Sequence, residues 1–464
     1  MNFAHNTNEV ASEEIYLPGG SVYFLGIGGI GMSAIARYFN GRGVRVSGYD
    51  KTPSALTKEL EIEGIEVHYV DDVNLIDKNA SLVVFTPALP PDHKELNYYK
   101  NNGFNLRKRS EVLGMITGST FNICVAGTHG KTTTSAMIAH LLRHSGFGCN
   151  AFLGGIATNY NSNFWRSNRS VCVAEADEYD RSFLQLSPDI AVITSMDADH
   201  LDIYGSEENM QEAFLEFSGK LKTGGLLIYK KGLQRERELR SENLMSYSLS
   251  DNSADAFADN VNTYSGSYNY DVTVKDRRIS GFTLNMGGRH NIENSVVAVS
   301  VGVHLGLDDE SLKKAIAEFK GVKRRFEYII KGDDLVFVDD YAHHPQELRA
   351  LIDGVRDLYP TRKMTMVFQP HLYSRTRDLA DEFAAVLSLA DEVILLPVYP
   401  ARELPIEGVD SEMLAEKINK KVRVVEMKEL PEMIGKLKPE LLVTAGAGDI
   451  DTILASIKNS LTTP

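Results

Sequence analysis

The sequence has little cysteine and no excess of positive charge. Its 464 residues include three cysteines, Cys124, Cys149 and Cys172, which form neither a CxxC pair nor an even framework. This usage excludes a disulfide scaffold and is expected of a protein in the reducing cytoplasm. A formal net charge of −14 opposes binding to nucleic acid or to anionic lipid, because both are polyanions.

The sequence also lacks the features of a secreted or membrane-inserted protein. Its N-terminus has no basic segment followed by an apolar core, so no signal peptide is expected. Residues 15–36 carry no charge and would be long enough to cross a bilayer. They contain six glycines and a proline, however, so we expect a strand, a glycine turn and the start of a helix there, and no insertion into a membrane.

Strand-like and helix-like stretches alternate along the chain in three successive units. The length suits about three domains, and such alternation is typical of parallel α/β sheets that bind ligands at the carboxyl ends of their strands. The first unit ends near Gly118, the second begins at Phe121, and the third follows the basic residues 323–325. We therefore predict an α/β protein with three domains: residues 1–118, 119–325 and 326–464.

The apolar runs and helical stretches predict individual elements. Residues 241–268 are rich in Ser, Asn and Tyr, and we expect surface loops and antiparallel edge strands there. The strands expected elsewhere are residues 21–25, 44–48, 82–86, 121–126, 170–174, 189–194, 335–338, 364–368, 393–396 and 441–444. The expected helices include residues 32–40, 135–143, 291–305 and 308–319.

A glycine turn between a strand and a helix is the most informative motif. It reads Gly-Thr-His-Gly-Lys-Thr-Thr-Thr over residues 127–134, although Val125 stands where the standard phosphate-binding pattern has glycine. Backbone N–H groups and the helix N-terminus in such a turn face phosphate, the lysine neutralises the terminal phosphates, and a threonine hydroxyl reaches Mg²⁺. We predict ATP binding by Gly127, Thr128, His129, Gly130, Lys131, Thr132 and Thr133.

A second glycine turn lies near the N-terminus. Residues 26–31 fit the pattern G-x-G-x-x-G after a strand, and Asp50 ends the next expected strand, where it would accept a hydrogen bond from a ribose hydroxyl. The turn predicts a ligand with a diphosphate group. A NAD-dependent oxidoreductase is one alternative on this motif alone, but hydride transfer does not need the second, ATP-like turn.

Two acidic segments, residues 175–180 and 197–202, follow strands of the central unit. Carboxylates in this place can hold the divalent cation of ATP, while the alternative is that most of them are solvated turns. His200 is a less usual ligand for Mg²⁺, because hard cations prefer oxygen.

Histidines and arginines follow strands of the third unit. His343 and His344 precede Pro345, which suits the first turn of a helix, and His371 comes shortly before Arg375, which with Arg377 could clamp a carboxylate. Ordinary loop polarity is one alternative, and a zinc site of His343, His344 and His371 is another. In the central unit, His290 and Asn291 open a helix and would either read a base edge or cap that helix.

These motifs, in this order, resemble those of the bacterial Mur ligases. The resemblance covers nearly the whole chain and implies an N-terminal Rossmann-like UDP-binding domain, a central P-loop ATPase domain and a C-terminal Rossmann-like domain that closes over the nucleotide. It accounts for two phosphate-binding turns, one for UDP and one for ATP. The matching segments are residues 26–32, 127–134, 175–180, 199–202, 288–294, 321–327, 339–345, 368–376 and 446–449.

The resemblance implies roles for individual residues. At the ATP site, Lys131 would contact the phosphates, Arg325 would lie near the transferred phosphate, and Mg²⁺, for which Mn²⁺ can substitute, would be held by Thr132, Glu175 and His200. The adenosine would meet His290, Asn291, Asn294 and Asp339. The UDP sugar would meet Gly26, Gly28, Gly29, Ile30, Gly31, Met32, Asp50 and His129. The muramyl and alanyl groups would meet Tyr341, His343, His371 and Arg375.

Within the family, the branch that adds L-alanine to UDP-N-acetylmuramate fits best. No lysine lies between His200 and Lys220, where other Mur ligases carry a carbamoylated lysine that this branch is thought to lack. The turn Gly-Ile-Gly-Gly-Ile-Gly-Met also favours it over the main alternative, a ligase that recycles whole tripeptides onto the same sugar. The sequence departs from the family at two positions: Ser195 stands where many relatives have asparagine, and Leu372 where some have arginine.

The resemblance implies a cytoplasmic, ATP-dependent enzyme of peptidoglycan synthesis with two small-molecule substrates, working as a monomer or weak homodimer. The lactyl carboxylate would become an acyl phosphate, and the amine of L-alanine would displace phosphate from it. Lys131, Glu175, His200 and Arg325 would be catalytic, with His344 or His343 as the base for the amine. A regulatory ATP-binding protein without ligase activity is a further alternative.

Overall fold

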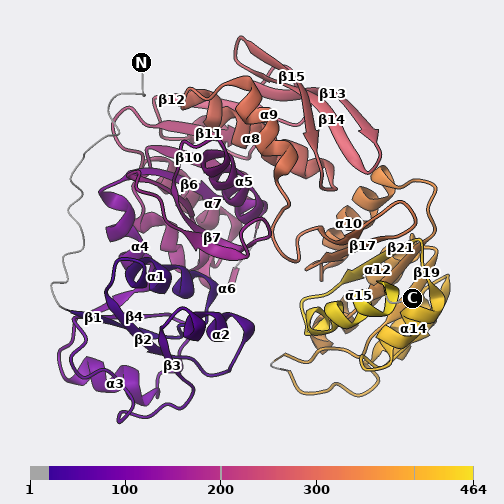
Figure 1. The fold of residues 1–464 in the computed structure, drawn as a ribbon, viewed down its shortest axis with the longest axis horizontal. Helices are drawn as coiled ribbons and strands as arrows, with labels where there is room; N and C mark the ends of the chain where they lie inside the picture. The colour runs from indigo at the N-terminus through magenta and orange to yellow at the C-terminus, as the bar shows by residue number, and fades with distance from the viewer. Residues whose placement is uncertain (1–19, 199–200, 402, 463–464) are drawn as a thin grey trace. The chain divides into compact units, whose positions relative to one another are not determined.

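The computed structural model describes residues 20–198, 201–401 and 403–462. Its internal contacts divide the chain into two compact units. The second unit consists of residues from 320 onward together with segments 260–270 and 283–292, and the first consists of the remaining residues. Strands and helices alternate along most of the chain (Figure 1). Within these described ranges, no helix is both long enough and apolar enough to cross a membrane.

The first sheet is parallel, in the order β3-β2-β1-β4-β5, so that the first strand of the chain lies in its centre. Its strands are β1 (Ser21–Leu25), β2 (Arg45–Tyr49), β3 (Glu66–His68), β4 (Leu82–Phe85) and β5 (Leu106–Lys108). Four helices connect them or follow the last: α1 (Ile30–Asn40), α2 (Ala55–Ile62), α3 (Lys94–Asn101) and α4 (Arg109–Gly118).

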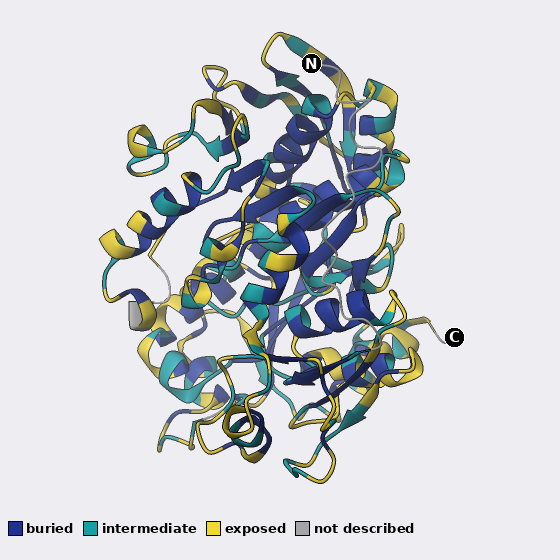
Figure 2. Cartoon of the chain, turned by 90° about the vertical axis from the view of Figure 1, so that its left-hand side faces the viewer, coloured by how far each residue is buried: buried dark blue, intermediate teal, exposed yellow. Residues whose placement is uncertain are grey.

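Both faces of this sheet are buried. Val22 and Phe24 of β1 pack in one cluster with Phe39 of α1, whereas Tyr23 and Leu25 pack in a second cluster with residues of α3. Successive side chains of a strand point to opposite faces, so a continuous apolar run such as β1 is the pattern of a strand covered by helices on both sides. Figure 2 shows the strands mostly in the colour of buried residues, with exposed residues gathered in loops and helix ends.

The second sheet has the order β15-β14-β13-β12-β11-β10-β6-β9-β7-β8. Neighbouring strands from β13 through β9 to β7 pair in parallel, and β8 runs antiparallel to β7. Its strands are β6 (Phe121–Ala126), β7 (Asn150–Ala157), β8 (Ser162–Trp165), β9 (Val171–Glu175), β10 (Ile190–Ile193), β11 (Leu226–Lys230), β12 (Asn243–Ser248), β13 (Ala256–Tyr264), β14 (Ser267–Val274) and β15 (Arg277–Leu284).

Helices of this region follow the strands closely. The α-helices are α5 (Lys131–His144), α6 (Leu201–Tyr204), α7 (Glu207–Ser218), α8 (Arg289–His304) and α9 (Asp309–Glu318), and short 3₁₀ helices are η2 (Tyr179–Gln185) and η3 (Glu236–Glu238). Helix α5 begins directly after the second glycine of its turn, because Gly130 adopts the left-handed conformation that precedes the first helical residue.

The third sheet has the order β16-β17-β21-β18-β19-β20, with only β16 antiparallel. Its strands are β16 (Glu327–Lys331), β17 (Val336–Asp340), β18 (Met364–Phe368), β19 (Glu392–Leu395), β20 (Lys421–Val424) and β21 (Leu441–Ala445). Its helices are α10 (Pro345–Leu358), α11 (Tyr373–Asp378), α12 (Ala380–Leu387), α13 (Ser411–Lys417), α14 (Leu430–Leu437), η4 (Ile450–Ile453) and α15 (Leu454–Thr462).

The predicted α/β architecture with three successive sheets is confirmed. Strands 121–126 and 364–368 were predicted with the bounds that the structure has. The prediction for residues 241–268 was wrong in one respect, since β12 lies inside the sheet and pairs in parallel with β11 instead of forming an antiparallel edge. Polar composition there predicted exposure, but β12 gains a partner on each side.

Candidate active site

The turn after β6 has the geometry of a phosphate-binding loop. Gly127 and Gly130 both have positive φ, at +135° and +81°, which a side chain would strain. A Cβ built on Gly127 would also lie 2.8 Å from the backbone N of Ser195. The two glycines therefore let the loop pass close to the end of β10 and turn into α5, whose N-terminus faces the loop.

Residues at the end of β10 brace this loop. Ser195 Oγ accepts a hydrogen bond from the backbone N–H of His129 and lies 2.8 Å from Thr128 Oγ1. Thr194 Oγ1 lies within hydrogen-bond distance of two carbonyl oxygens, that of Ala126 at 3.1 Å and that of His129 at 2.5 Å, and its one hydrogen can be donated to either. Ser195 thus fixes the loop of this protein through its hydroxyl.

Lys131, the first residue of α5, is held by two acceptors. Its Nζ donates to the carbonyl of Gly127 and to Glu178 Oε1, both at 2.7 Å. Glu178 is 1% exposed, and burial raises the pKa of its carboxyl while the Lys131 ammonium opposes that shift. The sequence patterns did not predict a role for Glu178 at this site. Its place in the acidic segment 175–180 after β9 is a signal that it shares with the five other residues of that segment.

Glu175 and Thr132 lie together beside Lys131. Glu175 ends β9, the neighbour of β6, and its carboxylate interacts with the Thr132 hydroxyl and accepts from the Gly154 N–H at 3.1 Å. Burial raises the pKa of the Glu175 carboxyl, with Lys131 and Thr132 acting against it. A carboxylate at the end of β9 and a hydroxyl in the first turn of α5 supply the oxygen donors that Mg²⁺ prefers. His200, the third predicted ligand, lies outside the described residues.

A residue of the second turn of α8 also approaches the loop. The Asn294 side chain is buried, and its Oδ1 would lie 3.2 Å from a Cβ built on Gly130. One turn earlier, Asn291 donates through Nδ2 to the carbonyl of Gly287. This contact stabilises the start of the helix, which is one of the two roles expected from the sequence; the other is contact with a base edge. His290 in the same turn is exposed.

The glycine turn after β1 is arranged around Asp50. Gly28 donates its N–H to Asp50 Oδ2 at 2.7 Å, and a Cβ on Gly28 would lie 2.6 Å from Thr57 Cγ2, so glycine is required there. Gly29 precedes α1 without a side-chain cap, so the first N–H groups of the helix remain oriented toward the turn. Ile30 and Gly31 begin the helix, and Met32 is buried beneath it.

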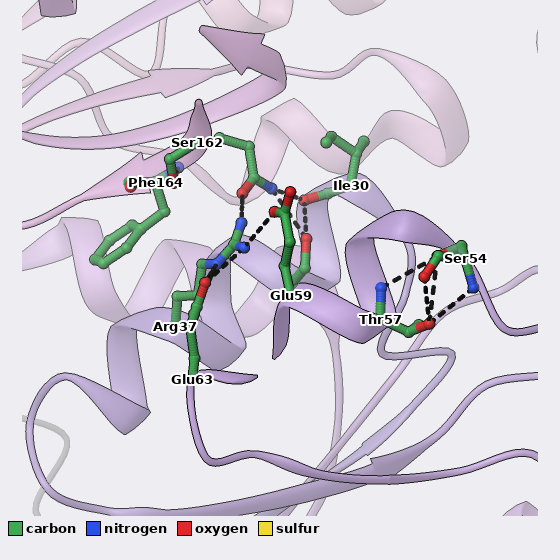
Figure 3. Close-up of polar contacts among 10 residues, drawn as sticks. Ile30, Arg37, Ser54, Thr57, Glu59, Glu63, Ser162 and Phe164 are labelled. Carbon is green, nitrogen blue, oxygen red and sulfur yellow. Dashed lines mark hydrogen bonds and ion pairs between the residues drawn. The ribbon is translucent and has the colours of Figure 1, made fainter. Parts of the chain in front are cut away.

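A buried polar pair holds α1 in place. Arg37 Nη1 donates to Asn163 Oδ1 at 2.5 Å, and the same guanidinium contacts Glu59 and Glu63 of the region of α2 (Figure 3). Asn163 on β8 donates through Nδ2 to the carbonyl of Ile30, at 2.5 Å. The second sheet thereby fixes the helix start that follows the first glycine turn.

In the second unit, the ends of β17, β21 and β18 are adjacent and carry most of the remaining predicted residues. Asp339 is fully buried, with Oδ1 accepting from Thr444 Oγ1 at 2.5 Å and Oδ2 lying 3.4 Å from Arg324 Nε. Burial raises the pKa of this carboxyl to about 7. Arg325 lies 5.6 Å from the ring centre of Tyr341.

The histidines of this unit form one cluster with Arg375. His343 Nδ1 lies 2.9 Å from the carbonyl of Tyr341, so Nδ1 carries the hydrogen of the neutral ring and Nε2 is the basic nitrogen. The His343 ring lies edge to face on His371, 5.8 Å between centres, and Arg375 Nη1 is 3.3 Å from His371 Nδ1. Burial lowers the pKa of both histidines. His344 precedes Pro345 at the start of α10, as predicted.

The zinc alternative is wrong. Throughout the part of the chain that the structure describes, which includes His343, His344 and His371, no three His, Cys, Asp or Glu side chains are placed to hold a metal ion.

Leu372 has a φ of +71°, which is rare for a residue with a side chain. Its N–H donates to the Tyr399 carbonyl at 3.0 Å, and its carbonyl accepts from Thr376 Oγ1 at 2.7 Å.

Three family models match consecutive parts of the chain. They are described as the Mur ligase family, catalytic domain, over residues 21–120; the Mur ligase middle domain, over 125–302; and the Mur ligase, glutamate ligase domain, over 324–454. The chain belongs to the Mur ligase family. The predicted resemblance to the Mur ligases is confirmed. Each of the three sheets of this Mur ligase falls largely within one of the three matches.

The similar proteins align with nearly the whole of this Mur ligase. The UDP-N-acetylmuramate–L-alanine ligase of Flavobacterium johnsoniae is 48% identical over 448 residues, 95% of this chain and 98% of the relative, and that of Parabacteroides distasonis is 48% identical over 449 residues, 95% and 97%. Among solved structures, the UDP-N-acetylmuramate–alanine ligase of Thermotoga maritima has a TM-score of 0.82 at 27% identity, covering 94% of this chain and 98% of its own. A murein peptide ligase of Psychrobacter arcticus shares the fold, with a TM-score of 0.66 at 22% identity over 96% and 99%.

Proposed function

We propose that this protein is an ATP-dependent ligase that joins L-alanine to the lactyl carboxylate of UDP-N-acetylmuramate in peptidoglycan precursor synthesis. The observation that carries the proposal is the convergence of Lys131, Thr132 and Glu175 on the glycine loop after β6. The relatives at 48% identity, which bear the name of this activity, support the choice of substrates. Conversion of a carboxylate to an amide needs activation. The glycine turn proposed for the nucleotide sugar lies in the same compact unit as the loop proposed for ATP.

The first step requires the neutralisation of charge. The lactyl carboxylate attacks the γ-phosphate of ATP, which gives an acyl phosphate and ADP. Two unit charges ~4 Å apart repel by about 4 kcal/mol even at an effective dielectric constant of ~20. Lys131 at the loop and the guanidinium of Arg325 are the protein cations assigned to offset this repulsion.

Thr132 and Glu175 are the residues that would hold Mg²⁺, with His200 as the third proposed ligand. Their oxygen donors, which include the half-buried carboxylate of Glu175, fit a hard cation. When bound, Mg²⁺ polarises the phosphate and neutralises part of its charge. Gly127, Thr128, His129, Gly130 and Thr133 would surround the phosphates through the loop and the start of α5. The nucleoside would lie against His290, Asn291, Asn294 and Asp339.

The nucleotide sugar would bind at the first glycine turn. Gly26, Gly28, Gly29 and Gly31 give the diphosphate access to backbone N–H groups, Ile30 and Met32 continue the turn into α1, and His129 would contact the sugar from the second turn. Asp50 holds the Gly28 N–H, so its proposed contact with a ribose hydroxyl would use its other oxygen, which in the structure accepts from the backbone of Thr52 at 3.3 Å.

The second step would take place at the histidine cluster. Arg375 is a cation for the carboxylate of L-alanine, and Tyr341, His343 and His371 line the same end of the sheet. The amine must lose a proton before it displaces phosphate. Of the two candidate bases, His343 has the basic Nε2 and a pKa lowered by burial, so it is neutral at neutral pH, and His344 is the other.

The domain boundaries 118/119 and 325/326 belong to the proposal as well. The first and second family matches meet between residues 120 and 125 and the third begins at residue 324, although the second ends at residue 302. The tripeptide-recycling activity is the second candidate. Two murein peptide ligase structures are 22% and 24% identical to this chain, so that likeness extends to the fold alone.

An isotope experiment tests the acyl phosphate directly. UDP-N-acetylmuramate labelled with oxygen-18 in the lactyl carboxylate is incubated with Mg-ATP, L-alanine and the protein. We expect one labelled oxygen in the released phosphate and an amide product of the mass of UDP-N-acetylmuramoyl-alanine. Amide without label in the phosphate would contradict the acyl phosphate, and the absence of amide would contradict the proposed function.

A further inference from the structure

Arg109 lies against the first glycine turn. It is the first residue of α4, and a Cβ built on Gly31 would lie 3.3 Å from Arg109 Cζ and closer still to Nη1. Gly31 is in the first turn of α1, which contains no acidic residue and has no side-chain cap. A guanidinium is thus placed beside backbone N–H groups that already favour an anion.

The other side of the same guanidinium is paired with an aspartate. Arg109 Nη2 lies 2.9 Å from Asp177 Oδ2, and both side chains are partly exposed, 23% and 35%. Asp177 stands between Glu175 and Glu178, the carboxylates beside Lys131, and its charge raises the pKa of both. Arg109 therefore connects the turn of the first sheet with the acidic segment of the second.

We propose that Arg109, which is paired with Asp177 in the structure, is a diphosphate-binding residue, so that a nucleotide diphosphate at the first turn and Asp177 compete for one guanidinium. The inference rests on the proposed function, because it takes the first turn as the site of the nucleotide sugar. Arginine suits this role, since its planar donors can bind phosphate in a bidentate manner and exchange one oxyanion for another.

The competition links the two sites. When Arg109 turns to the diphosphate, the charge of Asp177 is no longer neutralised, and the negative potential beside Glu175 and Glu178 increases. A divalent cation at Glu175 then binds more tightly. By the reciprocity of linked equilibria, Mg²⁺ with nucleotide tightens the binding of the sugar diphosphate by the same factor.

Two variants of this pair separate ligand binding from a structural ion pair. Arg109→Gln should weaken the binding of UDP-N-acetylmuramate, measured by calorimetry on the full chain, by about 10- to 100-fold. It should weaken the binding of UDP alone by the same factor, because the contact is with the diphosphate. Asp177→Asn should tighten both by about 2- to 5-fold, because it removes a competitor of the strength of a surface ion pair.

The adjacent pair provides the matched control. Lys108 Nζ lies 2.9 Å from Asp180 Oδ2, so Lys108→Gln breaks an ion pair between the same two segments without removing the cation placed against Gly31. It should leave the affinity for UDP unchanged. Arg109→Lys, which keeps the charge, should bind with an affinity between those of wild type and Arg109→Gln, and melting curves identify any variant that fails to fold.

The outcomes are distinct. Opposite effects of Arg109→Gln and Asp177→Asn, with the Mg²⁺-nucleotide coupling lost in Asp177→Asn, would support the inference. Equal weakening by both variants would show that the pair only braces the two segments, and would overturn it, as would wild-type affinity of Arg109→Gln. If the wild-type chain itself binds no UDP-N-acetylmuramate, the proposed function fails first.

Discussion

Lys131 Nζ lies 2.7 Å from Oε1 of Glu178, a carboxylate that is 1% exposed. The lysine assigned to the phosphates of ATP therefore has a buried counterion within the protein itself. Such a pair is stable only while both partners are present, because either charge alone would be buried without compensation. Activity and stability at this position are thus connected, and a single substitution tests both together.

Lys131→Ala should abolish turnover and lower the free energy of unfolding of the region around the loop by about 3–5 kcal/mol, because Glu178 is left unpaired. Lys131→Ala combined with Glu178→Gln removes both charges and should regain most of that stability while staying inactive. Urea unfolding and phosphate release measure the two effects. Binding of UDP-N-acetylmuramate to the folded double variant should be retained; its loss would show that the two glycine turns do not serve separate ligands.

Gly154→Ala should move the Glu175 carboxylate, since the added Cβ would lie 2.5 Å from Glu175 Cδ. We expect turnover at limiting Mg²⁺ to fall by about 10- to 100-fold, as is usual when a residue that orients a metal ligand is changed. A Mg²⁺ titration of activity measures the shift. Gly118→Ala is the control, because a Cβ there meets no atom within 4 Å. An unchanged Mg²⁺ requirement in Gly154→Ala would remove Glu175 from the metal site.

The stability of the first sheet should fall as pH rises, owing to Glu95. This carboxylate is fully buried, accepts a hydrogen bond from Tyr23 Oη at 2.8 Å, and lies 3.7 Å from His68 Nε2. Burial raises its pKa from 4.5 to about 7. The folded state therefore holds the proton more tightly than the unfolded state. The resulting stabilisation is complete below pH 4.5 and is lost as pH rises through 7, a change of about 3 kcal/mol at most.

Glu95→Gln, which stays neutral, should remove this dependence. Hydrogen exchange of the β1 amides, compared between variant and wild type at about pH 5 and about pH 8, gives the difference in opening free energy at each pH. A variant that gains stability relative to wild type only at the higher pH agrees with the expectation. The same difference at both values would show that Glu95 is ionised throughout.

Asn163→Ala should destabilise the junction between α1 and the second sheet by about 2–4 kcal/mol, because it leaves Arg37 Nη1 and the Ile30 carbonyl without their buried partner. Since Ile30 follows the first glycine turn, the affinity for UDP-N-acetylmuramate should also fall. Urea unfolding and calorimetry measure these changes. Asn79→Ala, in an exposed turn, should change neither; equal stability of both variants would contradict the assigned role of Asn163.

Sequence patterns predicted the elements whose burial is continuous. Residues 121–126 and 364–368 are apolar except for one polar residue each, Asn122 and Thr365, so the runs themselves mark the buried strands β6 and β18. The glycine turn then predicted the start of α5 only approximately, because the helix begins at Lys131, where three threonines weaken the helical pattern. The pairing of β12 was not predictable, since a strand's partners lie far away in the sequence.

The site was predictable in its motif residues and not in the residues that hold them. Glu178, which contacts Lys131, directly precedes the short helix η2, in which Asp180 and Arg181 have positive φ. No local sequence pattern predicts this bend of the backbone. Arg109 and Asp177 are separated by 68 residues, as measured along the chain, and Arg37 and Asn163 by 126. Such contacts are set by the packing of two sheets, for which a single sequence contains no direct signal.

The central claim is that the two turns serve one ligase reaction, and phosphate release from Mg-ATP tests it most directly. The wild-type chain is assayed with UDP-N-acetylmuramate and L-alanine, with either omitted, and with the tripeptide L-alanyl-γ-D-glutamyl-diaminopimelate in place of alanine. We predict release that requires both the sugar and L-alanine. Release that depends on the tripeptide instead would contradict the choice of amine, and release independent of the sugar, or none at all, would contradict the ligase reaction itself.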